Sequence, residues 1–158
     1  MILADGIRIA SDNTEREEGF EPVPYVCPGG WWTVGIGHCL GIRAGANSPP
    51  GTKATGCLPI SLPTARMILK GDFEYSADAF RRRFPNWNMI GSFTDRRCAA
   101  LLEMLFNLGE TRFDGFERMV LAANLGLWEE ASAHCLDSKA ARQLPDRYER
   151  IAKMIREG

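Results

Sequence analysis

Apolar residues recur at helical spacing through most of the chain after residue 63. Over residues 63–84 they follow the helical period, and Ser61 or Thr64 can cap the start of a helix. The apolar positions are Met67, Ile68, Phe73, Ala77 and Phe80. The pattern predicts a helix over 63–84 that is long enough to link two lobes.

The segment that begins at Thr94 is apolar on every side of its helical period from Cys98 to Leu108. That pattern is typical of a helix buried all round, so we expect it to form the core of a helical lobe. Shorter helical patterns follow over residues 116–124, 128–135 and 145–156.

Turn-forming residues concentrate in residues 19–63 instead. Aromatic and β-branched residues at 25–27 and 31–37 flank the turn formers Pro28, Gly29 and Gly30, which predicts a β-hairpin. Residues 41–59, which include Pro49 and Pro50, read as an irregular loop. We therefore expect an α+β fold, mostly helical, in which a small β-hairpin lobe precedes a larger helical lobe.

The chain length of 158 residues fits one domain or two small lobes that share a core. We expect a single domain over 1–158. Its parts are an N-terminal helix and β lobe at about 1–62, a linking helix at 63–84 and a helical lobe at 85–158.

Charge and apolar content exclude several classes of protein. A net charge of −1 lacks the basic excess of nucleic-acid-binding proteins, and we interpret the run Arg81–Arg83 as a solvated helix face. No apolar run is long enough to span a bilayer, and the first residues lack a basic leader, so we expect a protein made in the cytoplasm. Five cysteines, an odd number, favour reduced thiols.

The densest group of reactive side chains is Glu18, Cys27 and Thr33. Glu18 ends an expected helix, Cys27 follows the first strand, and Thr33 lies in the second. A glycoside hydrolase needs a carboxylic acid to protonate the leaving oxygen and a second group on the other face of the sugar. The three residues fit that chemistry, although a glutamate before a glycine is also common at the end of a surface helix.

The spacing resembles that of phage-type muramidases, the T-even lysozyme and endolysin group of glycoside hydrolase family 24. Eight residues separate Glu18 from Cys27, five separate Cys27 from Thr33, and the motif Gly-x-Gly-His follows at residues 35–38. The segments 96–111, 115–119, 127–131 and 143–151 also resemble the corresponding family segments.

The resemblance implies a lysozyme-like two-lobe fold. It also implies hydrolysis of the β-1,4 bond between N-acetylmuramic acid and N-acetylglucosamine in peptidoglycan, leading to lysis of the bacterial host. Glu18 would be the general acid, and Cys27 and Thr33 would act on the attacking water. Further roles follow by similarity: Arg147 pairs with Glu18, His38 pairs with Asp72, and Asn107, Phe116 and Gln143 line the glycan cleft.

The same resemblance implies a monomer without cofactor or metal. Such an enzyme reaches the periplasmic cell wall after a partner such as a holin has permeabilised the membrane.

Three features depart from the family pattern besides Cys27, which stands where aspartate is more common. Asn107 replaces a longer amide, and the chain is not basic. Residues 11–18 are polar throughout and lack the apolar stripe expected of a packed helix.

Three alternatives stay open from the residues themselves. Cys27 and His38 could form the catalytic pair of a peptidase or amidase. A zinc site could use Cys27, His38, Cys39 and Cys57, although no C-x-x-C pair is present. The chain could also be a non-catalytic module that binds peptidoglycan. New reducing ends, new amines or no product would distinguish a glycosidase, a peptidase or amidase, and a binding module.

Overall fold

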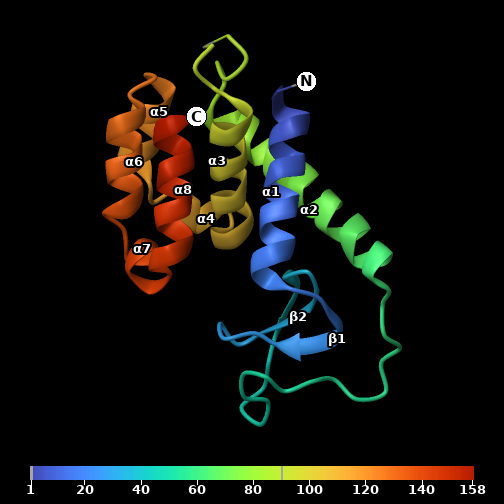
Figure 1. Ribbon diagram of the computed structural model, residues 1–158. Coiled ribbons are helices and arrows are strands. Elements are labelled where there is room, and N and C mark those ends of the chain that lie inside the picture. Colours follow the sequence, from blue (N-terminus) through green and yellow to red (C-terminus); the bar gives the residue numbers. More distant parts are fainter. Residues whose placement is uncertain (1, 90) are drawn as a thin grey trace. The chain divides into compact units, whose positions relative to one another are not determined.

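The computed structural model describes residues 2–89 and 91–158, which form eight helices and one three-stranded antiparallel sheet (Figure 1). The fold is α+β and mostly helical, as the sequence predicts. The chain divides into two compact units. The hairpin unit is Ser11–Asp72, and the helical unit is Phe73–Gly158 together with the residues up to Ala10. None of the helices in residues 2–89 and 91–158 is both long and apolar enough to cross a membrane.

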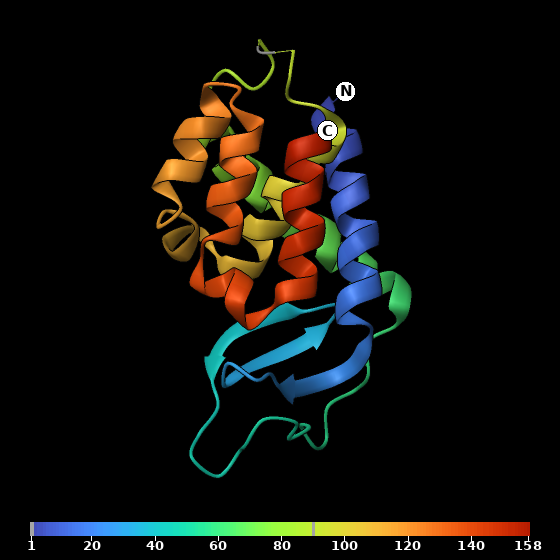
Figure 2. The same cartoon turned by 60° about the vertical axis from the view of Figure 1, so that its left-hand side comes forward.

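The sheet of the hairpin unit contains β1 (Glu21–Val26), β2 (Trp31–Gly35) and β3 (His38–Arg43), in that order (Figure 2). The predicted hairpin is confirmed as β1 and β2. The expectation of an irregular loop from residue 41 is wrong at its start, because β3 continues to Arg43. All residues of β3 after His38 are exposed, so the strand has no alternation of apolar and polar residues to reveal it.

The loop at residues 44–61 covers the outer edge of β1. Ala54 N donates to Pro24 O at 2.8 Å, and Ile60 N donates to Pro22 O at 2.9 Å. Proline has no N–H to offer, which confines it to strand edges of this kind. The two prolines accept bonds from the loop and leave no strand N–H unpaired at their positions.

Two helices run through both units. Helix α2 (Leu62–Arg83) lies within a residue of the prediction, and the Ser61 hydroxyl caps it by accepting from Thr64 N at 3.2 Å. Its buried stripe includes Ala65, Leu69, Phe73, Ala77 and Phe80. The expected apolar position Met67 is exposed, and Arg83 is not part of a solvated face, since its side chain is only 13% exposed.

Helix α1 (Ile2–Glu18) is packed through small residues. Leu3, Gly6, Ala10 and Thr14 are buried. A Cβ at Gly6 would lie 3.0 Å from Cys98 Cβ, so only glycine fits where α1 approaches the helical core. Thr14 is 4% exposed and takes the place of the missing apolar residue. A stripe of small residues buries a helix without producing the strong apolar pattern that we expected.

Helix α3 (Asp95–Leu108) is the core of the helical unit, as predicted. The Thr94 hydroxyl caps it by accepting from Arg97 N at 3.3 Å, and every residue from Cys98 to Leu105 is buried. The other predicted helices are also present, as α5 (Glu117–Asn124), α6 (Trp128–Leu136) and α8 (Pro145–Glu157). Helix α8 packs against both α3 and α6 (Figure 1).

Two short helices, α4 (Glu110–Phe113) and α7 (Lys139–Gln143), are not among those predicted from the sequence. Each has about one turn, which is too short to show a helical period. An isolated turn is unstable in water, so both depend on contacts with the rest of the unit.

Arg97 fixes the end of α8 through backbone oxygens. Its guanidinium donates to the backbone oxygens of Ile155, Ser92 and Arg156, each at 2.8 Å. It also lies 4.6 Å from the ring centroid of Trp128. Burial lowers the pKa of Arg97, and the carbonyls satisfy its donors in place of water.

The five cysteines are free thiols, as expected. Cys98 and Cys135 are fully buried, and burial raises the pKa of each thiol to about 12. They act as small apolar core residues.

Candidate functional site

The second glycine of the Gly-x-Gly motif lies directly against the side chain of Glu18. Gly37 has φ +72°, and a Cβ there would lie 3.2 Å from Glu18 Cγ and 3.6 Å from Glu18 Oε2. Gly35 has φ +68°, and its Cβ would lie 3.2 Å from the Cβ of Ala65 in α2. Both positions need glycine for the backbone angle and for the close approach. The side chain at the end of α1 therefore lies directly on the turn between β2 and β3.

The thiol of Cys27 lies in a turn whose polar groups stabilise negative charge. Burial on its own raises the pKa of this thiol. Hydrogen bonds from the backbone of Trp31 and the side chain of Thr33 lower it, as do those from the backbone of Gly29 and Gly30. The net result is a pKa below the ordinary value of a cysteine. Converging N–H groups of this kind favour an anion, so the turn favours the thiolate.

The hydroxyl of Thr33, in β2, is near both Trp31 O and the Cys27 sulfur. It is 4% exposed, and its hydroxyl donates to Trp31 O at 3.2 Å. The same hydroxyl is also a hydrogen-bond partner of the Cys27 sulfur. A hydroxyl carries one proton and can donate to one acceptor at a time. Thr33 can therefore accept from a neutral thiol or turn to donate to a thiolate.

Tyr25 lies near these groups, although the sequence did not predict it as a site residue. The strand register places it opposite Thr33, on the same face of the sheet. Burial raises the pKa of Tyr25, and the negative charges of Glu18, Cys27 and Glu21 raise it further. The signal in the sequence was the position of Tyr25, which lies two residues before Cys27 in the strand that leads into its turn.

Two ion pairs anchor this unit to α2. His38 Nδ1 lies 2.8 Å and 3.0 Å from the two carboxylate oxygens of Asp72, so the expected pair is present. Arg66 binds Glu15 with both Nη2 and Nε, at 2.7 Å and 3.0 Å. The hydrogen bond from Arg66 lowers the pKa of Glu15. Since Glu15 is one turn before Glu18, the second pair also fixes the end of α1 that carries the candidate acid.

The helical unit contains a pocket of about 860 Å³ between α4, α5 and α7. Phe116 and Gln143, two of the residues expected to contact glycan, both line it. Asn107 is half-buried near the end of α3 and does not line this pocket. Arg147 lies in the first turns of α8, and its pairing with Glu18 stays a prediction.

Histidine, cysteine, aspartate and glutamate are the side chains that most often hold metal ions in proteins. No cluster of three or more such residues is arranged for a metal in the part of the chain that the structure describes. The contacts of Cys27 are with Trp31, Thr33 and the turn, and those of His38 are with Asp72.

Comparison with known protein families agrees with this geometry. The sequence model of the phage lysozyme family matches residues 15–148. The match begins one turn before Glu18, includes the whole sheet, and extends into α8. With a match over most of its length, the chain belongs to the phage lysozyme family.

Proposed function

We propose that the protein is a muramidase of the endolysin type, which hydrolyses the β-1,4 bond between N-acetylmuramic acid and N-acetylglucosamine in peptidoglycan. Membership of the phage lysozyme family supports a glycoside hydrolase that acts on the bacterial cell wall. The observation that carries the specific reaction is the position of the Glu18 carboxyl on Gly37, in the unit that also contains Cys27 and Thr33.

In the proposed reaction, Glu18 in its acid form donates a proton to the glycosidic oxygen as the bond to the anomeric carbon breaks. Cys27 acts from the opposite face of the sugar. As a thiolate it accepts a proton from the attacking water, and as a thiol it orients that water together with Thr33. Tyr25 is close enough to both groups for the charges of Glu18 and Cys27 to raise its pKa.

The glycan chain would bind along the helical unit as well. Phe116 offers an aromatic surface to a sugar ring, and Gln143 offers an amide from the same pocket. By similarity to the family, Asn107 also contacts glycan and Arg147 pairs with Glu18. We propose a monomer that is made in the cytoplasm, reaches the wall after a holin has opened the membrane, and causes lysis.

Mass spectrometry of the products from purified peptidoglycan tests this function. We expect new reducing ends from the wild type and a loss of roughly 10²- to 10⁴-fold in rate for Glu18→Gln, because an amide cannot donate an acidic proton. Glu17→Gln is the matched control, since Glu17 is an exposed glutamate that directly precedes Glu18. This variant should keep the wild-type rate.

The products also separate the alternatives. New amines would identify a peptidase or amidase that uses Cys27 with His38. Binding of peptidoglycan without any product would identify a non-catalytic module. Wild-type activity in Glu18→Gln would remove Glu18 from the role of general acid.

A further inference from the structure

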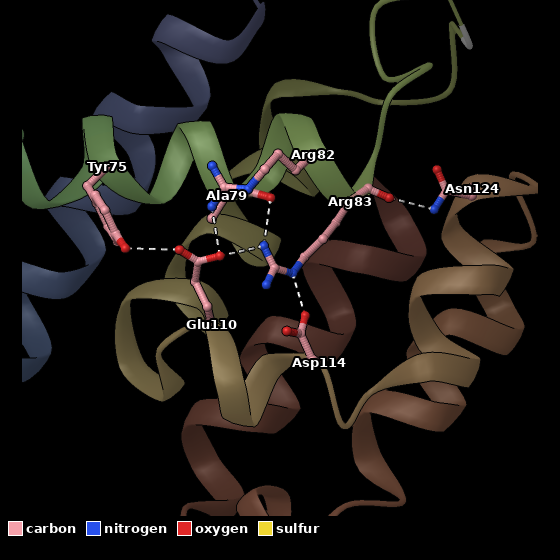
Figure 3. Close-up of polar contacts among 7 residues, drawn as sticks. All are labelled: Tyr75, Ala79, Arg82, Arg83, Glu110, Asp114 and Asn124. Carbon is pink, nitrogen blue, oxygen red and sulfur yellow. Dashed lines mark hydrogen bonds and ion pairs between the residues drawn. The ribbon is translucent and has the colours of Figure 1, made fainter.

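The one-turn helix α4 has two faces with different contacts. Thr111 and Arg112 line the pocket, together with Gly115 just beyond the helix. Glu110 and Asp114 lie four residues apart, which places them on one face, and this face points toward α2 (Figure 3). Because one turn of helix is not stable by itself, the pocket wall that α4 forms depends on what holds the other face.

Arg83, at the end of α2, binds both ends of that face (Figure 3). Its Nε lies 2.6 Å from Asp114 Oδ1, and its Nη1 lies 3.0 Å from Glu110 Oε2. The guanidinium carbon is also 5.8 Å from the ring centroid of Phe113, which is fully buried. One side chain thus contacts the first residue of α4, its last residue and the residue that follows.

Arg83 is itself held rigidly. Its Nη1 donates to Ala79 O at 3.0 Å, one turn earlier in α2. Its carbonyl oxygen accepts from Asn124 Nδ2 at 2.9 Å, which ties it to the end of α5. The side chain of Arg83 is only 13% exposed, so it has little room to move to other partners.

The two acidic partners are held differently. Glu110 also accepts from Arg82 Nη2 at 2.7 Å and from the Tyr75 hydroxyl at 3.0 Å. The pair with Arg83 anchors Asp114, which directly precedes Gly115 and Phe116 in the pocket wall. Removing the Asp114 carboxylate therefore releases the C-terminal end of α4, which leads to Phe116. The other contacts of Glu110 stay in place.

We propose that Arg83 is a positioning residue for glycan binding. Through Asp114 and Glu110 it holds α4, and so keeps Arg112 and Phe116 in the arrangement that binds the sugar chain. The inference rests on the proposed function, because it assigns the pocket to the glycan. Arginine suits this role because its planar fork can bind two carboxylates at once, which a lysine ammonium cannot do in the same geometry.

The test compares Asp114→Ala with Asp78→Ala. Asp78 forms an ion pair at 2.6 Å with Arg81 on the exposed side of α2, so its loss is a matched control without a contact to α4. Both aspartates are more than half exposed, and loss of either pair should change the melting temperature little. For Asp114→Ala we expect KM to rise about threefold to tenfold with kcat unchanged, while the control keeps both values.

Two further measurements separate positioning from general stability. The Kd for a soluble peptidoglycan glycan chain, measured in the Glu18→Gln background to prevent cleavage, should rise by the same factor as KM. Hydrogen exchange over residues 110–116 should become faster in Asp114→Ala and stay unchanged in Asp78→Ala. Arg83→Lys should show a KM between those of the wild type and Asp114→Ala, because it keeps the positive charge and loses the planar guanidinium group.

The outcomes distinguish the two proposals. A wild type that neither cleaves nor binds the glycan overturns both the proposed function and this role of Arg83. An active wild type whose KM and Kd are unaffected by Asp114→Ala overturns the role of Arg83 alone. Unchanged exchange over residues 110–116 also overturns it, since α4 would then be held by other contacts.

Discussion

Gly37 combines a backbone requirement with a close contact to Glu18, the candidate acid. A non-glycine residue at φ +72° costs about 1–2 kcal/mol, and a Cβ at 3.2 Å from Glu18 Cγ must displace the candidate acid. We expect Gly37→Ala to lower the free energy of unfolding by about that amount and to lower kcat by at least about tenfold. Chemical denaturation and product assays measure the two effects.

Gly41→Ala is the control for this prediction. Gly41 has φ +70°, and a Cβ there meets no other described atom within 4 Å. It should carry the same backbone cost and keep the wild-type kcat. Equal losses of kcat in the two variants would contradict a specific contact between Gly37 and Glu18.

Cys27 determines the acid side of the pH profile if it works as a thiolate. The turn lowers the pKa of its thiol, yet an aspartate ordinarily ionises at about pH 3.9, well below a thiol. Cys27→Asp should therefore keep substantial activity and extend kcat/KM to lower pH. Cys27→Ala should lose about 10²-fold, and Cys39→Ala should have no effect.

The measurement is kcat/KM against pH for the three variants and the wild type. A wild-type profile without a step for the thiol would indicate that a neutral thiol orients the water. Full activity in Cys27→Ala would leave Glu18 without a second catalytic side chain at this position.

At the scale of elements, α4 is stabilised by charge. Hydrogen bonds from Arg82, Tyr75 and Arg83 lower the pKa of Glu110 to about 2. A carboxyl whose pKa is lower in the folded state stabilises the fold above its unfolded value of about 4.3. That contribution falls as the pH decreases toward about 2.

We therefore expect Glu110→Gln to lower the melting temperature at pH 6, with a difference that shrinks between pH 5 and pH 2. Thermal unfolding across this range measures it. Glu130→Gln, which changes an exposed glutamate of α6, is the control and should show no such trend. A loss in Glu110→Gln that is equal at pH 6 and near pH 2 would show that the carboxylate charge is not what holds α4.

At the scale of the whole molecule, the stability of the helical unit depends on a continuous group of aromatic rings. Phe84 is fully buried, with ring centroids 5.7 Å from Phe93 and 6.4 Å from Phe113. Phe93 in turn lies 4.8 Å from Trp128. These rings join the end of α2 to α4 and α6.

Phe84→Ala should lower the free energy of unfolding by about 3–5 kcal/mol, because it removes a fully buried ring and leaves a cavity. Leu121→Ala is the control, since Leu121 is 62% exposed and its loss should cost less than about 0.5 kcal/mol. Denaturant titration followed by tryptophan fluorescence measures both. A small effect of Phe84→Ala would mean that the surrounding rings collapse into the space.

The sequence by itself determined the larger elements, because long helices and a hairpin with a Gly-rich turn leave strong local patterns. Helices α2, α3, α5, α6 and α8 and strand β2 lie close to their predicted positions, whereas β1 begins four residues before the predicted strand. The spacing of Glu18, Cys27 and Thr33 also predicted which residues would share the hairpin unit, since a short hairpin brings neighbours in sequence together.

Only the tertiary structure decided the rest, because those features depend on residues far apart in the chain. Helix α4 is paired with Arg83 through Glu110 and Asp114, β3 pairs with β2 without an apolar pattern, and Thr14 is buried although it is polar. Tyr25 joins the site through strand register and the charges around it. A local pattern records what each residue prefers, whereas these positions were decided by the contacts that other segments supply.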